Sequence, residues 1–463
     1  MMRLERIRTT LSNRGMSNAN AVTINSLQSL AETGKDGLMA RSSKIEGLYR
    51  MPMAERLRIV KEFGQLTDDE ALTLSGMGGV DPTLPDKMIE NAIGSFPIPL
   101  GVAANFKING KEYLVPMATE EPSVVAAASN AAKMAFDGGG FSASCTSPVM
   151  IGQVQVTGLK DPHGSKMEVL HRKAELIRLA NEQDPMLVKV GGGARDIEAR
   201  IITSHTGKQL VIHILVDVRD AMGANAVNTM AEAIAPKVEE MTGGRVYLRI
   251  LSNLAIHRLA RARAVWKSGS IGGGDVVDGV VEAYSFAEAD PFRCATHNKG
   301  IMNGIDAVML ATGNDTRAIE AGAHAYASIT GAYKPLTTYE KTAEGDLVGT
   351  IELPMAVGLI GGATKVHPTA RSCVKLLGVK DAAELAGIAA AVGLAQNFAA
   401  LRALATVGIQ KGHMSLHARN IVASVGCPPE LADEAVRIIV AEKKIRMDRA
   451  TEVVEELKAR RDK

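Results

Sequence analysis

The alternation of apolar and polar residues is most regular in the middle of the chain, where it predicts four strands and two helices. Apolar residues at every second position predict strands over residues 150–159, 196–205, 209–218 and 245–252. A period near 3.6 predicts amphipathic helices over residues 165–184 and from about Gly223 to Met241. The resulting order, β-α-β-β-α-β, is that of a ferredoxin-like unit. We therefore predict a self-contained domain over residues 148–252, inserted into a larger one.

The residues on both sides of this insert show mainly helical periods. We assign residues 46–147 and 253–406 to one large, mostly helical domain, so the predicted fold class is α+β. One further strand is expected over residues 111–117, before a helix rich in small residues that starts near Pro122. Thr67 and Glu70 have the spacing of a helix cap and predict the start of another short helix.

The two ends of the chain differ from the large domain. Residues 1–45 are polar and weakly patterned, and we interpret them as a flexible extension; a transit peptide is the alternative, which Glu5 disfavours. Residues 407–463 contain two helices with strongly charged outer faces, which are typical of a small, mobile C-terminal flap. The most apolar run, residues 385–404, carries polar groups such as Arg402 and predicts a buried core helix instead of a membrane span.

Composition excludes several classes of protein. The chain has 463 residues, 46% of them hydrophobic and 22% charged, so a disordered protein is excluded. At about 150 residues per domain, this length fits three domains or one large domain with an insert. A net charge of +2 argues against a nucleic-acid-binding protein but permits a local basic pocket for a small anion. The four cysteines form no CxxC pair and no signal peptide is recognisable, so we expect a reducing compartment, the cytoplasm.

Standard nucleotide-binding and hydrolase motifs are absent, since the chain has no GxGxxG, GxxxxGKS/T, GxSxG or HExxH. The turn from Asp217 to Asn225 joins a predicted strand to a helix, and Gly223 lets a ligand approach the free N–H groups of that helix. These features fit a pyrophosphate site, and an ordinary capped helix is the equal alternative. The glycines at 191–193 are a weaker candidate.

Two segments carry candidate acid–base chemistry. Between Arg293 and Asn303, polar residues interrupt apolar runs, and Lys299 could stabilise a developing oxyanion with Asp315 as its carboxylate partner. On spacing alone, a surface turn is the favoured alternative. Glu120–Glu121 opens the small-residue helix, where acids usually complement the helix dipole. In an apolar cleft, an acid there would instead donate a proton.

Two histidines in the C-terminal segment could act as metal ligands or as an acid. His413 and His417 are four residues apart and could share a helix face. No third ligand lies nearby, so we expect no metal site. A single histidine acting as general acid fits a mobile segment better.

Six separated motifs resemble one enzyme family. They are ENAIGSFPIPLG, PMATEEPSVVAAAS, DVRDAMGANAVNTM, THNKGIMNGI, ATGND and QKGHM, in this order. Together they closely resemble 3-hydroxy-3-methylglutaryl-coenzyme A (HMG-CoA) reductase in its class II form, from about residue 50 to the C-terminus. Ala92 departs from the family pattern, which has a larger residue there. The resemblance implies interconversion of HMG-CoA with mevalonate and coenzyme A by two hydride transfers with a nicotinamide cofactor.

The resemblance also implies the catalytic residues. Glu121 would exchange a proton with the substrate carbonyl oxygen, and Lys299 would stabilise the oxyanions. Asp315 would support that pair, and His413 would protonate the departing coenzyme A thiolate. These roles suit the chemistry, since hydride arriving at a thioester leaves an alkoxide, and a thiolate is well matched to a histidine acid. No metal and no cysteine nucleophile is needed.

Binding residues follow from the same motifs. The positions that hold the HMG carboxylate and hydroxyl and organise the lysine are matched by Arg293, Asn303 and Ser123. The dinucleotide turn is matched by Asp220, Met222, Gly223, Ala224 and Asn225. Asp184 matches the position that meets the adenosine ribose. A carboxylate there accepts from a 2′-hydroxyl and repels a 2′-phosphate, so NAD(H) is expected over NADP(H).

The family further implies a homodimer, or a multiple of dimers, with each active site at the subunit interface, and a flap that delivers His413. We expect neither nucleic acid nor membrane as a partner. A coenzyme A-dependent acyltransferase or lyase would leave the dinucleotide turn and Asp184 without purpose. A non-enzymatic, coenzyme A-binding regulatory protein is disfavoured because all four catalytic residues are retained. The sequence does not set the direction of the reaction, although an NAD preference favours mevalonate breakdown.

Overall fold

The structure, a computed structural model, describes residues 42–76, 84–406, 418–419 and 421–461. Most of the predicted N-terminal extension lies outside these residues, and so do His413 and His417. The described chain forms a six-stranded and a four-stranded sheet with helices around both. This mixture confirms the predicted α+β class.

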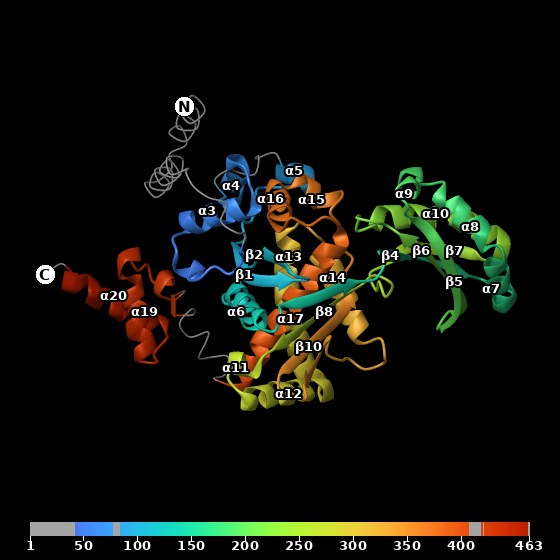
Figure 1. Cartoon of the computed structure of the whole chain (residues 1–463). Helices are drawn as coiled ribbons and strands as arrows, with labels where there is room; N and C mark the ends of the chain where they lie inside the picture. Colours follow the sequence, from blue (N-terminus) through green and yellow to red (C-terminus); the bar gives the residue numbers. More distant parts are fainter. Residues whose placement is uncertain (1–41, 77–83, 407–417, 420, 462–463) are drawn as a thin grey trace, which may run out of the picture.

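The six-stranded sheet lies at the centre of the molecule (Figure 1). Its order is β2-β1-β3-β8-β10-β9, with all neighbours antiparallel except β1 and β3. The strands are β1 (Leu100–Ile108), β2 (Lys111–Ala118), β3 (Phe141–Cys145), β8 (Leu259–Trp266), β9 (Thr337–Lys341) and β10 (Leu347–Pro354). Only β2 was predicted, so the large domain contains more sheet than its sequence pattern indicated.

One long helix, α17 (Ala382–Ala405), lies at the core of the region around the six-stranded sheet. It packs against β3, β8 and β10 and against α6 (Val124–Phe136), α12 (Gly274–Ala289) and α13 (Pro291–Ala311). By length and composition α17 could cross a membrane, but 67% of its most apolar window is buried inside the protein. The prediction of a buried core helix over residues 385–404 is therefore confirmed.

Glycine permits a close crossing of α13 and α17. A Cβ at Gly304 would lie 2.9 Å from the Gln396 Cβ and 3.1 Å from the Val392 carbonyl oxygen. We expect Gly304→Ala to lower the free energy of unfolding by about 1–3 kcal/mol, because the two helices must separate. Gly300, one turn earlier on α13, has no such neighbour within 4 Å. Gly300→Ala should therefore raise the free energy of unfolding by about 0.5–1 kcal/mol, because alanine favours the helix more than glycine does. Urea unfolding measures both, and equal effects would contradict the close crossing.

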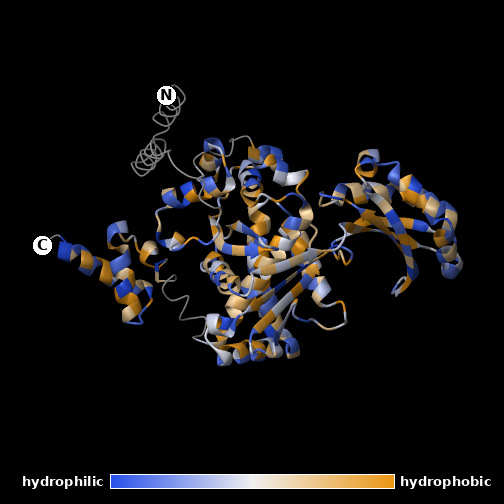
Figure 2. Cartoon of the chain, in the orientation of Figure 1, coloured by the Kyte–Doolittle hydropathy of each residue, from blue (hydrophilic) through white to orange (hydrophobic). Residues whose placement is uncertain are grey.

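The four-stranded sheet is formed entirely within residues 149–252. Its strands are β4 (Val149–Thr157), β5 (Gly193–Ser204), β6 (Gly207–Asp217) and β7 (Arg245–Ser252), all antiparallel in the order β5-β6-β4-β7. Helices α7 (Pro162–His171), α8 (Lys173–Asn181) and α10 (Ala224–Thr242) pack against this sheet. Figure 2 shows hydrophobic and hydrophilic residues interspersed along these elements. The chain order is the predicted β-α-β-β-α-β.

The first helix of this unit differs from its prediction. The single helix expected over residues 165–184 is interrupted at Arg172, whose φ of −100° and ψ of 17° end α7 before α8 begins. A third short helix, α9 (Pro185–Lys189), follows, and Asp184 caps its start. The sequence period continues across these breaks, which is why it predicted one helix.

The remaining elements complete the large domain and the C-terminal segment. They are η1 (Leu48–Arg50), α3 (Met53–Gly64), α4 (Asp68–Leu74), α5 (Leu84–Met88), α11 (Ser268–Ile271), α14 (Thr316–Ala327), α15 (Gly362–Val366), α16 (Pro368–Leu377), α19 (Pro429–Ala441) and α20 (Met447–Arg461). Thr67 and Glu70 form the predicted cap of α4 as a reciprocal capping box. Helices α19 and α20 share a small apolar core of their own.

Candidate functional site

Glu121 and Lys299 form an ion pair although they are 178 residues apart in sequence. The Lys299 Nζ lies 2.7 Å from the Glu121 Oε2, and the Asn303 Nδ2 donates to the Glu121 Oε1 at 3.3 Å. Lys299 and Asn303 lie four residues apart on α13 and so share a face of that helix. The side chains of Lys299 and Glu121 are 59% and 37% exposed, so a substrate can reach both.

Ser123 lies on the same turn as Glu121, just before α6, and has an unusual backbone. Its φ of 77° is in the left-handed region, where a residue with a side chain costs about 1–2 kcal/mol. Its Oγ is buried and has no hydrogen-bond partner among the described residues. A strained position with an unpaired hydroxyl is typical of a ligand contact.

Arg293 lies in the first turn of α13. Asp290, the cap of this helix, accepts from the Arg293 backbone N–H, not from its side chain. Partial burial lowers the pKa of the guanidinium, and no hydrogen bond or ion pair to the side chain occurs in the described part of the chain. A half-buried cation without a counter-charge is suited to binding a carboxylate.

The structure does not bring Asp315 into contact with the Glu121–Lys299 pair. Its carboxylate caps α14 by accepting from the Ala318 N–H at 3.1 Å, and the Arg317 Nε lies 3.8 Å away. Within the described ranges, no hydrogen bond or ion pair joins Asp315 to either residue of the pair. Its supporting role therefore stays a prediction.

A buried polar network anchors α13 behind Lys299. The His297 Nε2 lies 2.6 Å from the Thr337 Oγ1 of β9, and Thr337 donates to the Asn397 Oδ1 of α17 at 3.0 Å. Asn397 in turn donates to the His297 carbonyl oxygen at 3.3 Å. Burial, and to a smaller extent the charge of Arg293, lowers the pKa of His297 to about 3, so its imidazole is neutral. The network fixes the buried face of α13 and leaves Lys299 on the open face.

This buried histidine predicts loss of stability in acid. The unfolded imidazole takes up a proton near its ordinary pKa of about 6.5, whereas the folded one does not until about pH 3. The stabilisation is therefore complete above about pH 6.5 and lost as the pH falls, by about 1.4 kcal/mol per pH unit between pH 6 and 4. Urea unfolding at several pH values measures this slope. His297→Asn should reduce it, and His205→Asn, on an exposed turn, should not.

The turn before α10 has the features of a dinucleotide site. Gly223 has a φ of 100° and leads into the 19-residue helix α10 without any side-chain cap, so the N–H groups of Ala224 and Asn225 remain available. Met222 is half-buried beside them. Asp220 is turned to the large domain instead, since its Oδ1 accepts from the Ala382 N–H of α17 at 2.9 Å. The turn fits a pyrophosphate, with the Asp220 side chain engaged elsewhere.

A second group of residues lies beside this turn. The Asp184 Oδ1 accepts from the Leu187 N–H at 2.9 Å, which leaves its second oxygen without a hydrogen bond among the described residues. Arg195 and Arg219 both donate to the Gly191 carbonyl oxygen, and each lies 3.3 Å from the Asp217 Oδ2. Neither arginine was predicted from the sequence as a site residue, although Arg219 lies inside the DVRDAMG motif.

Neither metal nor thiol chemistry is indicated within the described residues. They contain no group of three or more histidine, cysteine or acidic side chains that could hold a metal ion. Burial raises the pKa of Cys145 and of Cys294 to about 11, and that of Cys373 to about 12. These thiols stay protonated at neutral pH and are poor nucleophiles.

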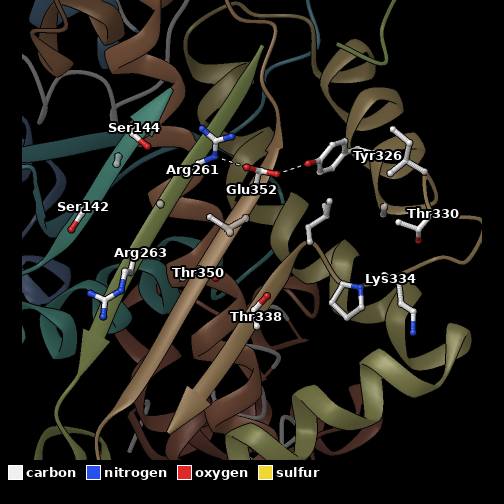
Figure 3. A pocket seen from close by; sticks show the side chains of 17 residues that line it. Ser142, Ser144, Arg261, Arg263, Tyr326, Thr330, Lys334, Thr338, Thr350 and Glu352 are labelled. Carbon is white, nitrogen blue, oxygen red and sulfur yellow. Dashed lines mark hydrogen bonds and ion pairs between the residues drawn. The ribbon is translucent and has the colours of Figure 1, made fainter. Parts of the chain in front are cut away.

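A cavity of about 650 Å³ lies elsewhere, on the open face of β3, β8 and β10 (Figure 3). There Glu352 accepts hydrogen bonds from the Arg261 Nε and the Tyr326 hydroxyl. Arg263 and Lys334 also line it. None of the predicted catalytic or cofactor residues lines this cavity. We assign the site by its chemistry.

Three comparisons with known proteins agree on one family. A family model described as hydroxymethylglutaryl-coenzyme A reductase matches residues 52–418. The 3-hydroxy-3-methylglutaryl-coenzyme A reductase of Archaeoglobus fulgidus is 61% identical over 420 residues, which are 91% of this chain and 96% of the relative. A class II enzyme of Streptococcus pneumoniae, solved bound to NADPH in open conformations, is 40% identical with a TM-score of 0.75; the match covers 88% of this chain and 100% of that chain.

Proposed function

This chain belongs to the class II hydroxymethylglutaryl-coenzyme A reductase family, and we propose that it interconverts HMG-CoA with mevalonate and coenzyme A through Glu121 and Lys299. The observation that carries the proposal is the 2.7 Å ion pair between them, with Asn303 on the second carboxylate oxygen. In such a pair the cation can stabilise an oxyanion on the substrate, and the carboxyl group can give a proton to that oxygen or take one from it.

The proposed mechanism uses the same pair twice in each turnover. Two nicotinamide cofactors, bound one after the other, would each supply one hydride, the first to the thioester carbon and the second to the aldehyde carbon. In both steps Lys299 stabilises the negative charge on the substrate oxygen, and one such donor contributes about 2.7–4 kcal/mol. Glu121 exchanges a proton with that oxygen. Between the steps the C–S bond breaks, and we assign protonation of the coenzyme A thiolate to His413, which lies outside the described residues.

Three further residues are proposed to hold the substrate. The Arg293 guanidinium has no counter-charge among the described residues, and the carboxylate of the HMG group would supply one. Ser123 follows Glu121 by two residues and has a buried, unpaired hydroxyl, and the Asn303 amide donates to Glu121; both would meet the polar groups near the reacting carbon. Asp315 is proposed to join the pair when substrate is bound.

Exposed apolar side chains support a homodimer. The segment that follows α5 exposes Ile93 and Phe96 by 105% and 90%, and Met88, Ile89 and Ile98 are exposed as well. Apolar groups gathered in this way usually mark an interaction surface. We propose that a second copy covers this segment and completes the active site, and that residues 407–463 form the flap that closes over it.

We propose NAD(H) as the preferred cofactor. The free oxygen of Asp184 can accept from a ribose 2′-hydroxyl and would repel a 2′-phosphate. Two observations favour NADP(H) instead. Arg195 and Arg219 could hold a phosphate, and the S. pneumoniae structure is bound to NADPH. The two cofactors therefore have to be compared directly.

Absorbance of the reduced nicotinamide tests both proposals in one assay with mevalonate, coenzyme A and either NAD or NADP. We expect NAD to be reduced rapidly, only when coenzyme A is present, and NADP much more slowly. Equal or faster reduction of NADP would overturn the preference assigned to Asp184 and keep the reaction. No reduction of either cofactor by a folded dimer, and no oxidation with HMG-CoA in reverse, would favour a non-enzymatic coenzyme A-binding protein.

A further inference from the structure

Arg258 connects the dinucleotide turn to the large domain. It lies between β7 and β8, where the chain returns from the four-stranded sheet, and is only 5% exposed. Its Nη1 donates to the carbonyl oxygens of Ala221 at 3.0 Å and Met222 at 3.2 Å, and its Nη2 donates to that of Val357 at 2.5 Å. One planar guanidinium therefore joins two segments of backbone in a fixed geometry.

The segment after β10 packs directly on the same turn. The Leu359 N–H donates to the Asp220 carbonyl oxygen at 2.8 Å. Gly358 makes this approach sterically feasible, because a Cβ there would lie 2.5 Å from the Met222 nitrogen. The contact therefore requires a residue without a side chain at position 358.

Two more hydrogen bonds extend these contacts toward the core and toward the ATGND loop. The Asp220 carboxylate accepts from Ala382 at the start of α17. The Gly358 N–H donates to the Asn314 Oδ1 at 2.8 Å, next to Asp315. The turn before α10, the central helix and the ATGND loop are thus held together around residues 357–359.

We propose that Arg258 is a positioning residue that holds the dinucleotide turn in a fixed place relative to the Glu121–Lys299 pair. Arg258 does not reach the reacting atoms; it acts through Ala221 and Met222. The inference rests on the proposed function, because it assigns the turn to the nicotinamide cofactor. Hydride transfer needs precise placement, and a shift of about 1 Å can lower the rate about 10²-fold.

Arg258→Lys gives the first test, because lysine keeps the charge but cannot span three carbonyl oxygens as a planar fork. We expect the KM for the nicotinamide cofactor to rise about tenfold and kcat to fall about 10- to 100-fold. The KM for mevalonate and for coenzyme A should stay within about twofold. Gly358→Ala should give the same pattern by pushing the segment off the turn. Arg263→Lys, at an exposed position of β8, is the matched control and should change none of these values.

The outcomes separate this inference from the proposed function. Thermal unfolding and sedimentation show whether each variant is folded. If Arg258→Lys does not fold, the kinetics of Gly358→Ala test the positioning role instead. Wild-type turnover with unchanged cofactor KM and kcat in the folded variants would overturn the positioning role and leave the function intact. A uniform change in all three KM values would also overturn it, because that indicates a general structural defect. Absence of nicotinamide-linked turnover in the wild type would overturn both the proposed function and the positioning role of Arg258.

Discussion

Replacing Lys299 with methionine is expected to lower kcat by about 10²- to 10³-fold while the protein stays folded. Methionine keeps much of the length and apolar character of the side chain but removes the cationic donor that we propose for the developing oxyanion. In the described residues, the Lys299 Nζ is the cationic group that pairs with Glu121. The KM for the substrate should change less than kcat, because the charge develops only in the transition state. Steady-state kinetics with mevalonate, coenzyme A and NAD measures both quantities.

A second lysine provides the control for this experiment. Lys341 on β9 is partly exposed and lies 2.6 Å from the Asp278 Oδ1, so it resembles Lys299 in environment but not in location. Lys341→Met should keep wild-type turnover. If Lys299→Met also did so, the role of this lysine would be wrong. A loss of turnover in both variants would point to a general effect of removing a surface charge.

The strands of residues 149–252 could be predicted because apolar and polar residues alternate along them. In β4, for example, Val154 and Val156 are buried, whereas Gln153, Gln155 and Thr157 are partly exposed. The period of two therefore appears directly in the sequence. The helix break at Arg172 could not be predicted, because the apolar period continues past it.

The central sheet gave a much weaker signal. In β8 the buried residues are Leu259 and Trp266 at the ends and Ala260, Ala262 and Ala264 between them, with exposed Arg261 and Arg263 alternating with the alanines. Alanine has little β preference and low hydrophobicity, so this alternation was not recognisable as a strand. The alanines are nevertheless required, because the sheet packs against the central helix α17 at close range. Tertiary packing decides the structure here, and local preference does not.

The candidate site shows the same division between local and tertiary information. On spacing alone the sequence favoured a surface turn around Lys299 and Asn303, and this was wrong, because both lie on one face of α13. The contact with Glu121 depends on how β2 and α13 pack, and the strained backbone of Ser123 has no sequence signal. Arg258 was not identified either, since its three acceptors are backbone carbonyls that any residue could supply.

Replacing Glu121 with glutamine should lower kcat by about 10²- to 10⁴-fold, the range for a general acid–base group. Glutamine has nearly the same shape and still accepts from Asn303, so the substrate site should keep its form. It cannot take up or release the proton at the substrate oxygen, and it no longer neutralises Lys299. The adjacent Glu120 is the strictest control available, because it is exposed and has no ion pair in the described structure. Glu120→Gln should keep full turnover, and the reverse result, loss in Glu120→Gln but not in Glu121→Gln, would move the proton transfer to the neighbouring carboxylate.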